Sequence, residues 1–195
     1  RYVIESRSGP VILTEHMKVD VHELIRDRNI CVVTVRDTRK ALSALSAAFF
    51  DHPAERMKMI GITGTNGKTT TAFLTAGILQ EAGYRVGMIG TIESYDGRRR
   101  ETVKNTTPES CEIHRLLSRM VENECDCCVM EVSSQGIALQ RTADIFFDIG
   151  VFLNIEPDHI GKGEHATFSE YLYCKSRLMR QCGIGIVNQD DPNVD

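Results

Sequence analysis

One stretch of the sequence, GITGTNGKTTT, combines the residue types that hold phosphate groups. Such a loop needs a tight backbone with inward-pointing amides, a cation, and a helix N-terminus behind it. Gly64 and Gly67 permit the tight backbone, Lys68 supplies the cation, and the Thr69 hydroxyl is a suitable magnesium ligand. The usual pattern has a glycine five positions before Gly67, where this chain has Ile62. The change shortens the loop and keeps its anion-binding centre.

The segments around this loop alternate between two hydrophobic patterns. Short β-branched and apolar runs indicate strands, and apolar residues at helical spacing indicate helices. We expect strands within residues 28–37, 57–63, 84–92, 125–134, 147–155 and 183–189, and helices within 38–53, 69–83, 108–124 and 167–182. This alternation predicts an α/β fold with a mostly parallel sheet and helices on both faces.

The helix expected after the loop is rich in large apolar residues. We expect one apolar face of this helix to be supplied by Phe73, Leu74, Gly77, Ile78 and Leu79.

Polar residues at the carboxyl ends of the strands are the next candidates, because ligands of such sheets bind there. The strand ends of interest are Thr63, Glu131, Asn154 and Asn188. Glu131 ends a buried strand, and its oxygens suit Mg²⁺. Asp158 and His159 follow a later strand, which places an imidazole beside the same nucleotide.

Lys175 lies in YLYCKSRLM, within an expected amphipathic helix. A lysine in such a helix is normally a solvated surface residue. The residues alone give it no role.

The composition excludes several classes of protein. A net charge of −4 and a pI near 5.9 argue against a general binder of nucleic acids or membrane surfaces. No apolar stretch approaches the roughly 20 residues needed to span a bilayer. The seven cysteines cannot all pair within one chain, and we expect Cys125 and Cys128 to be buried strand thiols. We therefore expect a cytoplasmic monomer without nucleic-acid or membrane partners.

The loop resembles the ATP loop of the Mur ligase superfamily. The resemblance is strong over residues 57–195 and weaker over 1–56. It implies that 57–195 is an ATP-binding central domain, incomplete at its C-terminal end, and that 1–56 is part of a small α/β N-terminal domain for the UDP substrate. The implied ATP contacts are Gly64, Thr65, Asn66, Gly67, Lys68, Thr69, Thr70 and Asn154.

The resemblance also gives Lys175 a role. In this superfamily a lysine in a segment like YxxxKxxL is carbamylated, which turns a cation into a carboxylate-like magnesium ligand. The resemblance implies that Thr69 and Glu131 hold one Mg²⁺, and that His159 and carbamylated Lys175 complete the metal cluster. The implied catalytic residues are Lys68, His159 and Lys175.

The stretch NTTPE is similar to one that contacts UDP-N-acetylmuramoyl-L-alanyl-D-glutamate (a UDP-MurNAc-dipeptide) in one branch of the superfamily. The substrate contacts implied are Asn105, Thr106, Thr107, Ser133 and Arg141. The chain departs from that branch at Gln135, where many members have histidine, and at Leu139, where some have glutamine. The segment IGKGEHATF also differs from the common LDYHG.

The implied reaction is ATP-driven amide formation through an acyl phosphate, with a free amino acid, L-lysine or meso-diaminopimelate, as the acceptor. Ligases of the folylpolyglutamate or cyanophycin type share the loop and the lysine, and a non-catalytic nucleotide-binding module is a further alternative. A phosphate-loop kinase or GTPase leaves Lys175 without a role, and the chain lacks the Asn-Lys-x-Asp guanine motif. Binding of the muramyl substrate separates these possibilities.

Overall fold

A computed structural model describes residues 3–6, 9–15, 31–158, 160–161 and 165–193. The chain divides within helix α2 (Thr38–Phe49) into two compact units, Arg1–Leu42 and Ser43–Asp195. The boundary proposed from the sequence, between residues 56 and 57, falls inside the second unit. The assignment of residues 1–56 to a UDP-substrate domain stays a prediction.

The first unit contains a three-stranded sheet of β1 (Val3–Ser6), β2 (Gly9–Thr14) and β3 (Cys31–Thr34). β1 and β2 are antiparallel, whereas β3 lies parallel to β2. Only β3 was expected from the sequence. The side chain of Asp37 caps the start of α2, because its Oδ1 accepts the amides of Arg39 and Lys40, each at 2.9 Å.

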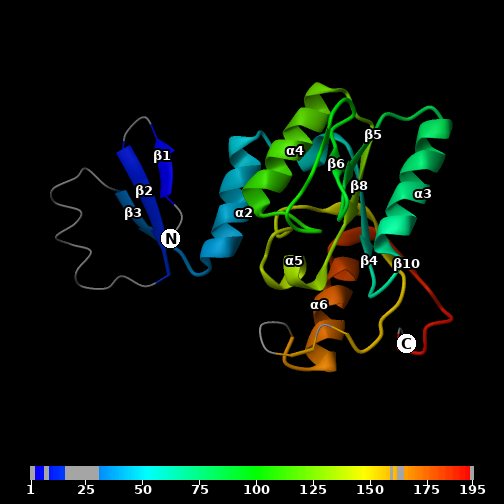
Figure 1. Cartoon of the computed structure of the whole chain (residues 1–195). Helices are drawn as coiled ribbons and strands as arrows, with labels where there is room; N and C mark the ends of the chain where they lie inside the picture. Colours follow the sequence, from blue (N-terminus) through cyan, green and yellow to red (C-terminus); the bar gives the residue numbers. More distant parts are fainter. Residues whose placement is uncertain (1–2, 7–8, 16–30, 159, 162–164, 194–195) are drawn as a thin grey trace. The chain divides into compact units, whose positions relative to one another are not determined.

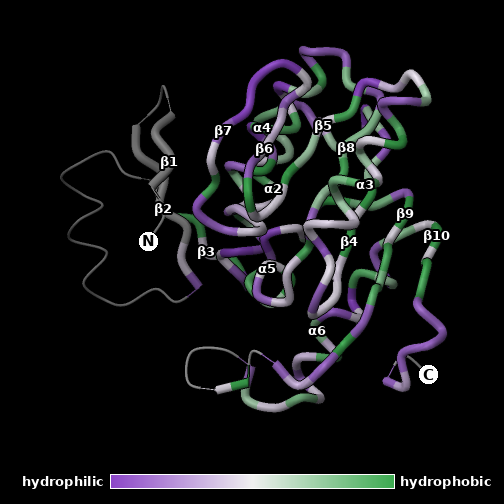
Figure 2. The backbone as a smooth tube through the Cα atoms, turned by 45° about the vertical axis from the view of Figure 1, so that its right-hand side comes forward, coloured by the Kyte–Doolittle hydropathy of each residue, from purple (hydrophilic) through white to green (hydrophobic). Residues whose placement is uncertain are grey.

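The second unit is built on a seven-stranded sheet with the order β10-β9-β4-β8-β5-β6-β7 (Figure 1). The strands are β4 (Lys58–Thr63), β5 (Val86–Ile89), β6 (Ser94–Tyr95), β7 (Arg100–Glu101), β8 (Cys127–Glu131), β9 (Phe147–Phe152) and β10 (Cys182–Val187). The strands from β10 to β5 are all parallel, and β6 and β7 add an antiparallel edge. Figure 2 shows hydrophobic residues along β5 and β8 and hydrophilic residues along β7. The predicted mostly parallel sheet is confirmed.

Helices cover both faces of this sheet, as expected. The helical elements are η1 (Pro53–Arg56), α3 (Lys68–Glu81), α4 (Ser110–Glu122), α5 (Ser134–Ala138) and α6 (Phe168–Arg180). One core cluster joins Met59 and Met130 of the strands to Leu117 of α4 and Leu178 of α6. A second cluster places α3 over strand residues that point the opposite way, including Ile62 and Val129. Figure 1 shows α3 and α4 on opposite sides of the central strands.

The apolar face expected for α3 is only partly the face that packs on the sheet, since Leu79 is the one large side chain of that set that packs on the core cluster. Ala72 and Ala76 are buried against the sheet, whereas Phe73, Leu74 and Ile78 are 38%, 62% and 69% exposed. The helix is apolar on most sides, so periodicity does not single out one face. Two alanines one turn apart allow the helix backbone to approach the sheet closely, and the larger side chains remain outside.

The buried cysteines follow the sequence interpretation, since Cys127 and Cys128 lie inside β8 and Cys125 lies just before it, all buried. Within the described ranges, no group of three or more His, Cys, Asp or Glu side chains is arranged to hold a metal ion. No helix in the same part of the chain has the length and apolar character to cross a bilayer.

Candidate functional site

The phosphate loop runs from the end of β4 to the start of α3 at Lys68. Gly67 is the N-cap of α3 and has a φ of 85°, a left-handed conformation that glycine adopts without steric cost. A Cβ at Gly64 would lie only 3.0 Å from Cβ of Leu153. Both glycines are therefore required by the loop geometry, and the loss of a glycine at Ile62 leaves that geometry intact.

Asn154, at the end of β9, holds the loop backbone. Its Oδ1 accepts the amide of Asn66 at 2.9 Å, and its Nδ2 donates to the carbonyl of Asn66 at 3.1 Å. The backbone carbonyl of Asn154 accepts the amide of Thr65 at 3.0 Å. The structure thus brings Asn154 to the loop, and its contacts there are to the protein backbone. Direct contact with ATP stays a prediction.

Two lysines meet at one backbone carbonyl of this loop. Lys68 Nζ donates to the carbonyl of Gly64 at 2.8 Å and to that of Thr65 at 3.0 Å. Lys175 Nζ, from α6, donates to the same Gly64 carbonyl at 2.6 Å. Lys175 is 1% exposed, so the surface position expected from helical patterning alone is wrong. The tertiary fold brings Lys175 of α6 to the loop between β4 and α3.

Burial and mutual repulsion change the titration of both lysines. Burial lowers the pKa of Lys175 to about 7, and the positive charge of Lys68 acts in the same direction. Burial also lowers the pKa of Lys68, while the negative charges of Glu131 and Asp158 oppose that shift. At neutral pH a substantial fraction of Lys175 is therefore an uncharged amine.

Glu131 lies at the end of β8 and is fully buried. Thr69 donates its hydroxyl to Glu131 Oε2 at 2.9 Å. Thr91 donates its amide to Oε1 at 2.8 Å and its hydroxyl to Oε2 at 3.0 Å. A Cβ at Gly90 would lie 2.5 Å from Glu131 Oε1, so glycine is needed beside this carboxylate. The sequence analysis missed Gly90 and Thr91, because it expected a strand up to Ile92. In the structure β5 ends at Ile89, so these two residues follow a strand end.

The donor set at this point suits a hard cation. The oxygens Thr69 Oγ1 and Glu131 Oε2 lie 2.9 Å apart, and Mg²⁺ prefers such oxygen ligands. His159, predicted to complete the cluster, lies outside the described residues. Metal binding by Thr69, Glu131, His159 and Lys175 stays a prediction.

The expected substrate residues form a connected group beside Glu131. Thr107 donates its hydroxyl to the backbone carbonyl of Glu131 at 3.0 Å and accepts the amide of Ser133 at 2.9 Å. Ser133 Oγ accepts the amide of Gly136 at 3.0 Å and so caps α5. Arg141 donates to the backbone carbonyl of Thr107 at 2.9 Å. The structure therefore brings Thr107, Ser133 and Arg141 together.

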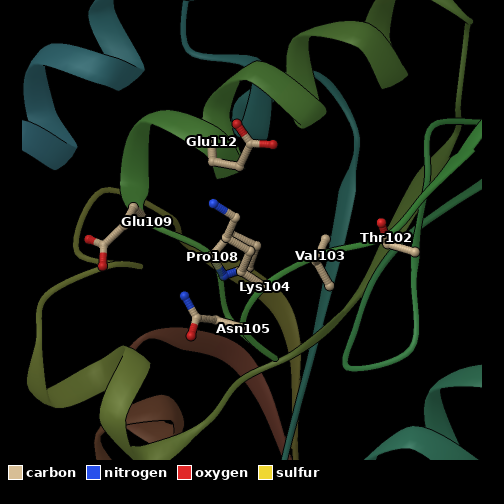
Figure 3. Close-up of a pocket in the computed structure, with 7 residues that line it drawn as sticks. All are labelled: Thr102, Val103, Lys104, Asn105, Pro108, Glu109 and Glu112. Atoms are coloured by element: carbon tan, nitrogen blue, oxygen red, sulfur yellow. The ribbon is translucent and has the colours of Figure 1, made fainter.

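Thr106 and Asn105 extend this group in two directions. Thr106 Oγ1 lies 3.1 Å from Thr91 Oγ1, and because the single hydroxyl proton of Thr91 goes to Glu131 Oε2, Thr106 is the donor in this link to the carboxylate. Asn105 lines a pocket of about 360 Å³ between the segment before α4 and the first turns of that helix (Figure 3). The remaining lining residues are Thr102, Val103, Lys104, Pro108, Glu109 and Glu112.

Residues 62–195 match the Mur ligase middle domain. The chain belongs to the Mur ligase family. It is 45% identical, over 164 residues, to the UDP-N-acetylmuramoyl-L-alanyl-D-glutamate–2,6-diaminopimelate ligase of Clostridium perfringens, covering 84% of this chain and 34% of that protein. It is 41% identical over 160 residues to the corresponding L-lysine ligase of Enterococcus faecalis, covering 81% of this chain and 32% of the relative. The chain thus spans about a third of the length of these curated relatives.

Solved structures agree with this Mur ligase assignment at the level of the fold. A UDP-N-acetylmuramoyl-L-alanyl-D-glutamate–2,6-diaminopimelate ligase structure superposes with a TM-score of 0.69 at 22% identity, covering 83% of this chain and 33% of that one. Mycobacterium tuberculosis folylpolyglutamate synthase, complexed with ADP and AMPPCP, gives a TM-score of 0.62 at 16% identity, covering 90% of this chain and 45% of that one. The resemblance stated from the loop sequence is therefore confirmed for the Mur ligase family and its fold.

Proposed function

We propose that this Mur ligase chain is the nucleotide-binding part of an ATP-dependent amide ligase of peptidoglycan precursor synthesis. The ligase would add L-lysine or meso-diaminopimelate to UDP-N-acetylmuramoyl-L-alanyl-D-glutamate. The observation that carries the proposal is the convergence of Lys68 and Lys175 on the Gly64 carbonyl. A phosphate loop accounts for Lys68 alone, whereas a second, buried lysine at the same carbonyl fits the chemistry of this family.

The nucleotide would occupy the loop between β4 and α3. The amides of residues 64–70 and the N-terminus of α3 would face its phosphates, and Lys68 would exchange its backbone carbonyl partners for phosphate oxygens. A phosphate oxygen carries more negative charge than an amide carbonyl, so this exchange favours nucleotide binding.

The environment of Lys175 supports the proposed carbamylation. Its buried amine has a pKa of about 7, so the uncharged form that attacks CO₂ is available at neutral pH. The nitrogen lone pair would form a bond to the CO₂ carbon, and one proton would leave the nitrogen, giving a carbamate. That product replaces a positive charge with a negative one beside Lys68, which removes the repulsion between the two lysines.

Thr69 and Glu131 would hold one Mg²⁺ and, with His159 and the carbamate of Lys175, complete the metal site. Bound Mg²⁺ would offset the charge that spreads over the transferring phosphoryl oxygens. Thr91 keeps the Glu131 carboxylate oriented through two hydrogen bonds. Catalysis of the first step would thus consist largely of positioning and charge neutralisation.

In the reaction, the D-glutamyl carboxylate would attack the γ-phosphate to give an acyl phosphate and ADP. The amine of the incoming amino acid would then attack the acyl carbon and release phosphate. Asn105, Thr106, Thr107, Ser133 and Arg141 would contact the muramyl substrate next to this point. The similar proteins include both a diaminopimelate ligase and a lysine ligase, so we propose either amino acid as the acceptor.

The test uses the natural gene product that carries this sequence. Isothermal titration should show binding of an ATP analogue with Mg²⁺ and of UDP-N-acetylmuramoyl-L-alanyl-D-glutamate, and a coupled assay should show ADP release that depends on lysine or diaminopimelate. Lys68→Ala should reduce turnover at least about a thousandfold, since it removes the cation at the transferred phosphate. Lys40→Ala, in α2, is the control and should act as wild type. Nucleotide binding without muramyl-substrate binding would favour the folylpolyglutamate or cyanophycin branch instead.

A further inference from the structure

Tyr171 lies next to both the phosphate loop and Lys175, and the proposed reaction assigns it no role. It is on α6 one turn before Lys175, so the two side chains share one face of the helix. Tyr171 is fully buried. A buried hydroxyl is costly unless it is hydrogen-bonded, so packing alone would favour phenylalanine at this position.

The hydroxyl of Tyr171 reaches the phosphate loop. It lies 3.1 Å from Thr65 Oγ1, a distance at which either hydroxyl can donate. Thr65 Oγ1 also accepts the amide of Glu156 at 3.0 Å. The Thr65 side chain is therefore held on one side by α6 and on the other by the segment that follows β9.

The ring of Tyr171 faces the second lysine. Lys175 Nζ lies 4.7 Å from the ring centroid, within cation–π distance, while it donates to the Gly64 carbonyl at 2.6 Å. Helix α6 thus contacts two consecutive loop residues, Gly64 through Lys175 and Thr65 through Tyr171. The spacing between the loop and Lys175 is set by both contacts.

We propose that Tyr171 is a positioning residue of the ligase reaction, whose hydroxyl fixes Thr65 of the phosphate loop next to Lys175. This inference rests on the proposed function, because the position of Lys175 matters to the reaction only if Lys175 acts near the γ-phosphate. Loss of the hydroxyl should impair the phosphoryl step more than nucleotide binding. The loop amides, Lys68 and the Asn154 contacts remain in place and still bind the nucleotide.

The test compares Tyr171→Phe with Tyr173→Phe in the natural gene product. Phenylalanine keeps the buried ring of Tyr171 and removes only its hydroxyl. Tyr173 is on the same helix but is 55% exposed, so it provides a matched control for the loss of a tyrosine hydroxyl. Thr65→Val removes the other partner of the hydrogen bond while keeping the shape of the side chain.

We expect kcat of Tyr171→Phe to fall about tenfold while KM for ATP stays within about twofold, as for the loss of one positioning hydrogen bond. If the hydroxyl acts through Thr65, the double variant with Thr65→Val should be no slower than Thr65→Val alone. Tyr173→Phe should match the wild type. An unchanged kcat in Tyr171→Phe, a rise in KM equal to the fall in kcat, or additive effects in the double variant would each overturn the inference.

A second readout does not depend on activity. In the nucleotide-free protein, amide hydrogen exchange of loop residues 64–68 should be faster in Tyr171→Phe and in Thr65→Val, and unchanged in Tyr173→Phe. Unchanged loop exchange in Tyr171→Phe contradicts the role of Tyr171 even if the wild type is an active ligase. A wild-type protein that lacks ligase turnover contradicts the proposed function, and the exchange measurement still decides whether Tyr171 fixes the loop.

Discussion

The site has two regions whose polar groups are satisfied in different ways. The nucleotide side, as proposed above, comprises residues 64–70, Glu131, Asn154 and Lys175. The proposed substrate side comprises Asn105, Thr106, Thr107, Ser133 and Arg141. On the nucleotide side, Lys68 and Lys175 donate to backbone carbonyls. On the substrate side, Arg141 forms an ion pair with Glu109 at 2.6 Å, and Thr107 both donates and accepts a hydrogen bond within the protein.

This difference separates side chains that are available to a ligand from side chains that hold the fold together. The Lys68 ammonium, which is held by neutral carbonyls, gains when a phosphate replaces those partners, because charge-assisted hydrogen bonds are stronger. Thr107 is already saturated by protein partners and is fully buried, so it serves the fold first. Substitutions on the nucleotide side should therefore alter activity, and several on the substrate side should alter stability.

After Lys68→Ala, the largest effect should come from Lys175→Ala on the nucleotide side. We expect turnover to fall about a thousandfold, as for the loss of a group that stabilises charge at the reacting centre. Added short-chain carboxylic acids should restore part of the activity, because a carboxylate can fill the space of the lost carbamate. A steady-state assay with and without acetate or propionate measures both effects.

Arg180→Ala is the control for Lys175→Ala, since Arg180 is an exposed cation on the same helix. It should keep near-normal turnover and gain nothing from the added acid. Wild-type turnover in Lys175→Ala would contradict the expectation that substitutions on the nucleotide side alter activity.

A smaller effect should appear in the free energy of unfolding when the pH is lowered, through a buried histidine next to the substrate side. His114 lies in α4, which starts directly after that segment; it is fully buried, and in the described part of the chain neither ring nitrogen has a hydrogen-bond partner. Burial lowers its pKa to about 4, the charge of His52 adds to the shift, and Asp144 opposes it. The unfolded chain, with an ordinary histidine pKa near 6.5, binds the proton more tightly than the folded chain.

Protonation of His114 therefore does not reduce the free energy of unfolding above pH 6.5. As the pH falls from 6.5 toward 4, the unfolded chain takes up the proton first, and the free energy of unfolding decreases by about 3 kcal/mol in total. Urea unfolding followed by circular dichroism at several pH values measures this loss. His114→Leu should flatten the pH dependence over that window. His52→Asn should retain most of it, because His52 is exposed and asparagine tolerates its left-handed backbone. An equally steep loss in His114→Leu would assign the acid sensitivity to other groups.

The smallest effect should separate two neighbouring threonines. Thr107→Val leaves the Ser133 amide and the Glu131 carbonyl without their partner and should lower the free energy of unfolding by about 2 kcal/mol. Thr106→Val is the matched control; Thr106 is only half-buried, so stability should change by less than about 0.5 kcal/mol while binding of the muramyl substrate weakens. Urea unfolding and calorimetric titration measure the two quantities. Equal destabilisation by both variants would show that Thr106 also belongs to the scaffold.

Much of the fold could be predicted from local patterns. The strand at β4, the loop and the start of α3 follow from apolar residues that lead into closely spaced glycines and a lysine. The strand-end rule found Glu131 and Asn154, because in a parallel sheet all carboxyl ends meet at one edge. It missed Gly90 and Thr91, because β5 ends at Ile89, before the end of the apolar run in the sequence.

The first unit and the short elements were harder to predict. β1 and β2 lie in a stretch with no loop motif to mark it, and β6 and β7 contain two residues each, too few to produce a periodic pattern. The buried face of α3 was predicted only in part, because small alanines pack closely on the sheet and Leu79 packs beside them, while Leu74 and Ile78 stay exposed.

The sequence by itself determined the chemistry at the loop, because the tight turn, the cation and the helix start lie next to one another in the chain. Only the tertiary structure decided the position of Lys175, which helical patterning placed on the surface. Residues distant in the chain, Gly64, Tyr171 and Lys175, come together because β4 and α6 belong to the same layered unit. Burial and the nearby charge of Lys68, neither visible in a local pattern, then set the pKa of Lys175 to about 7.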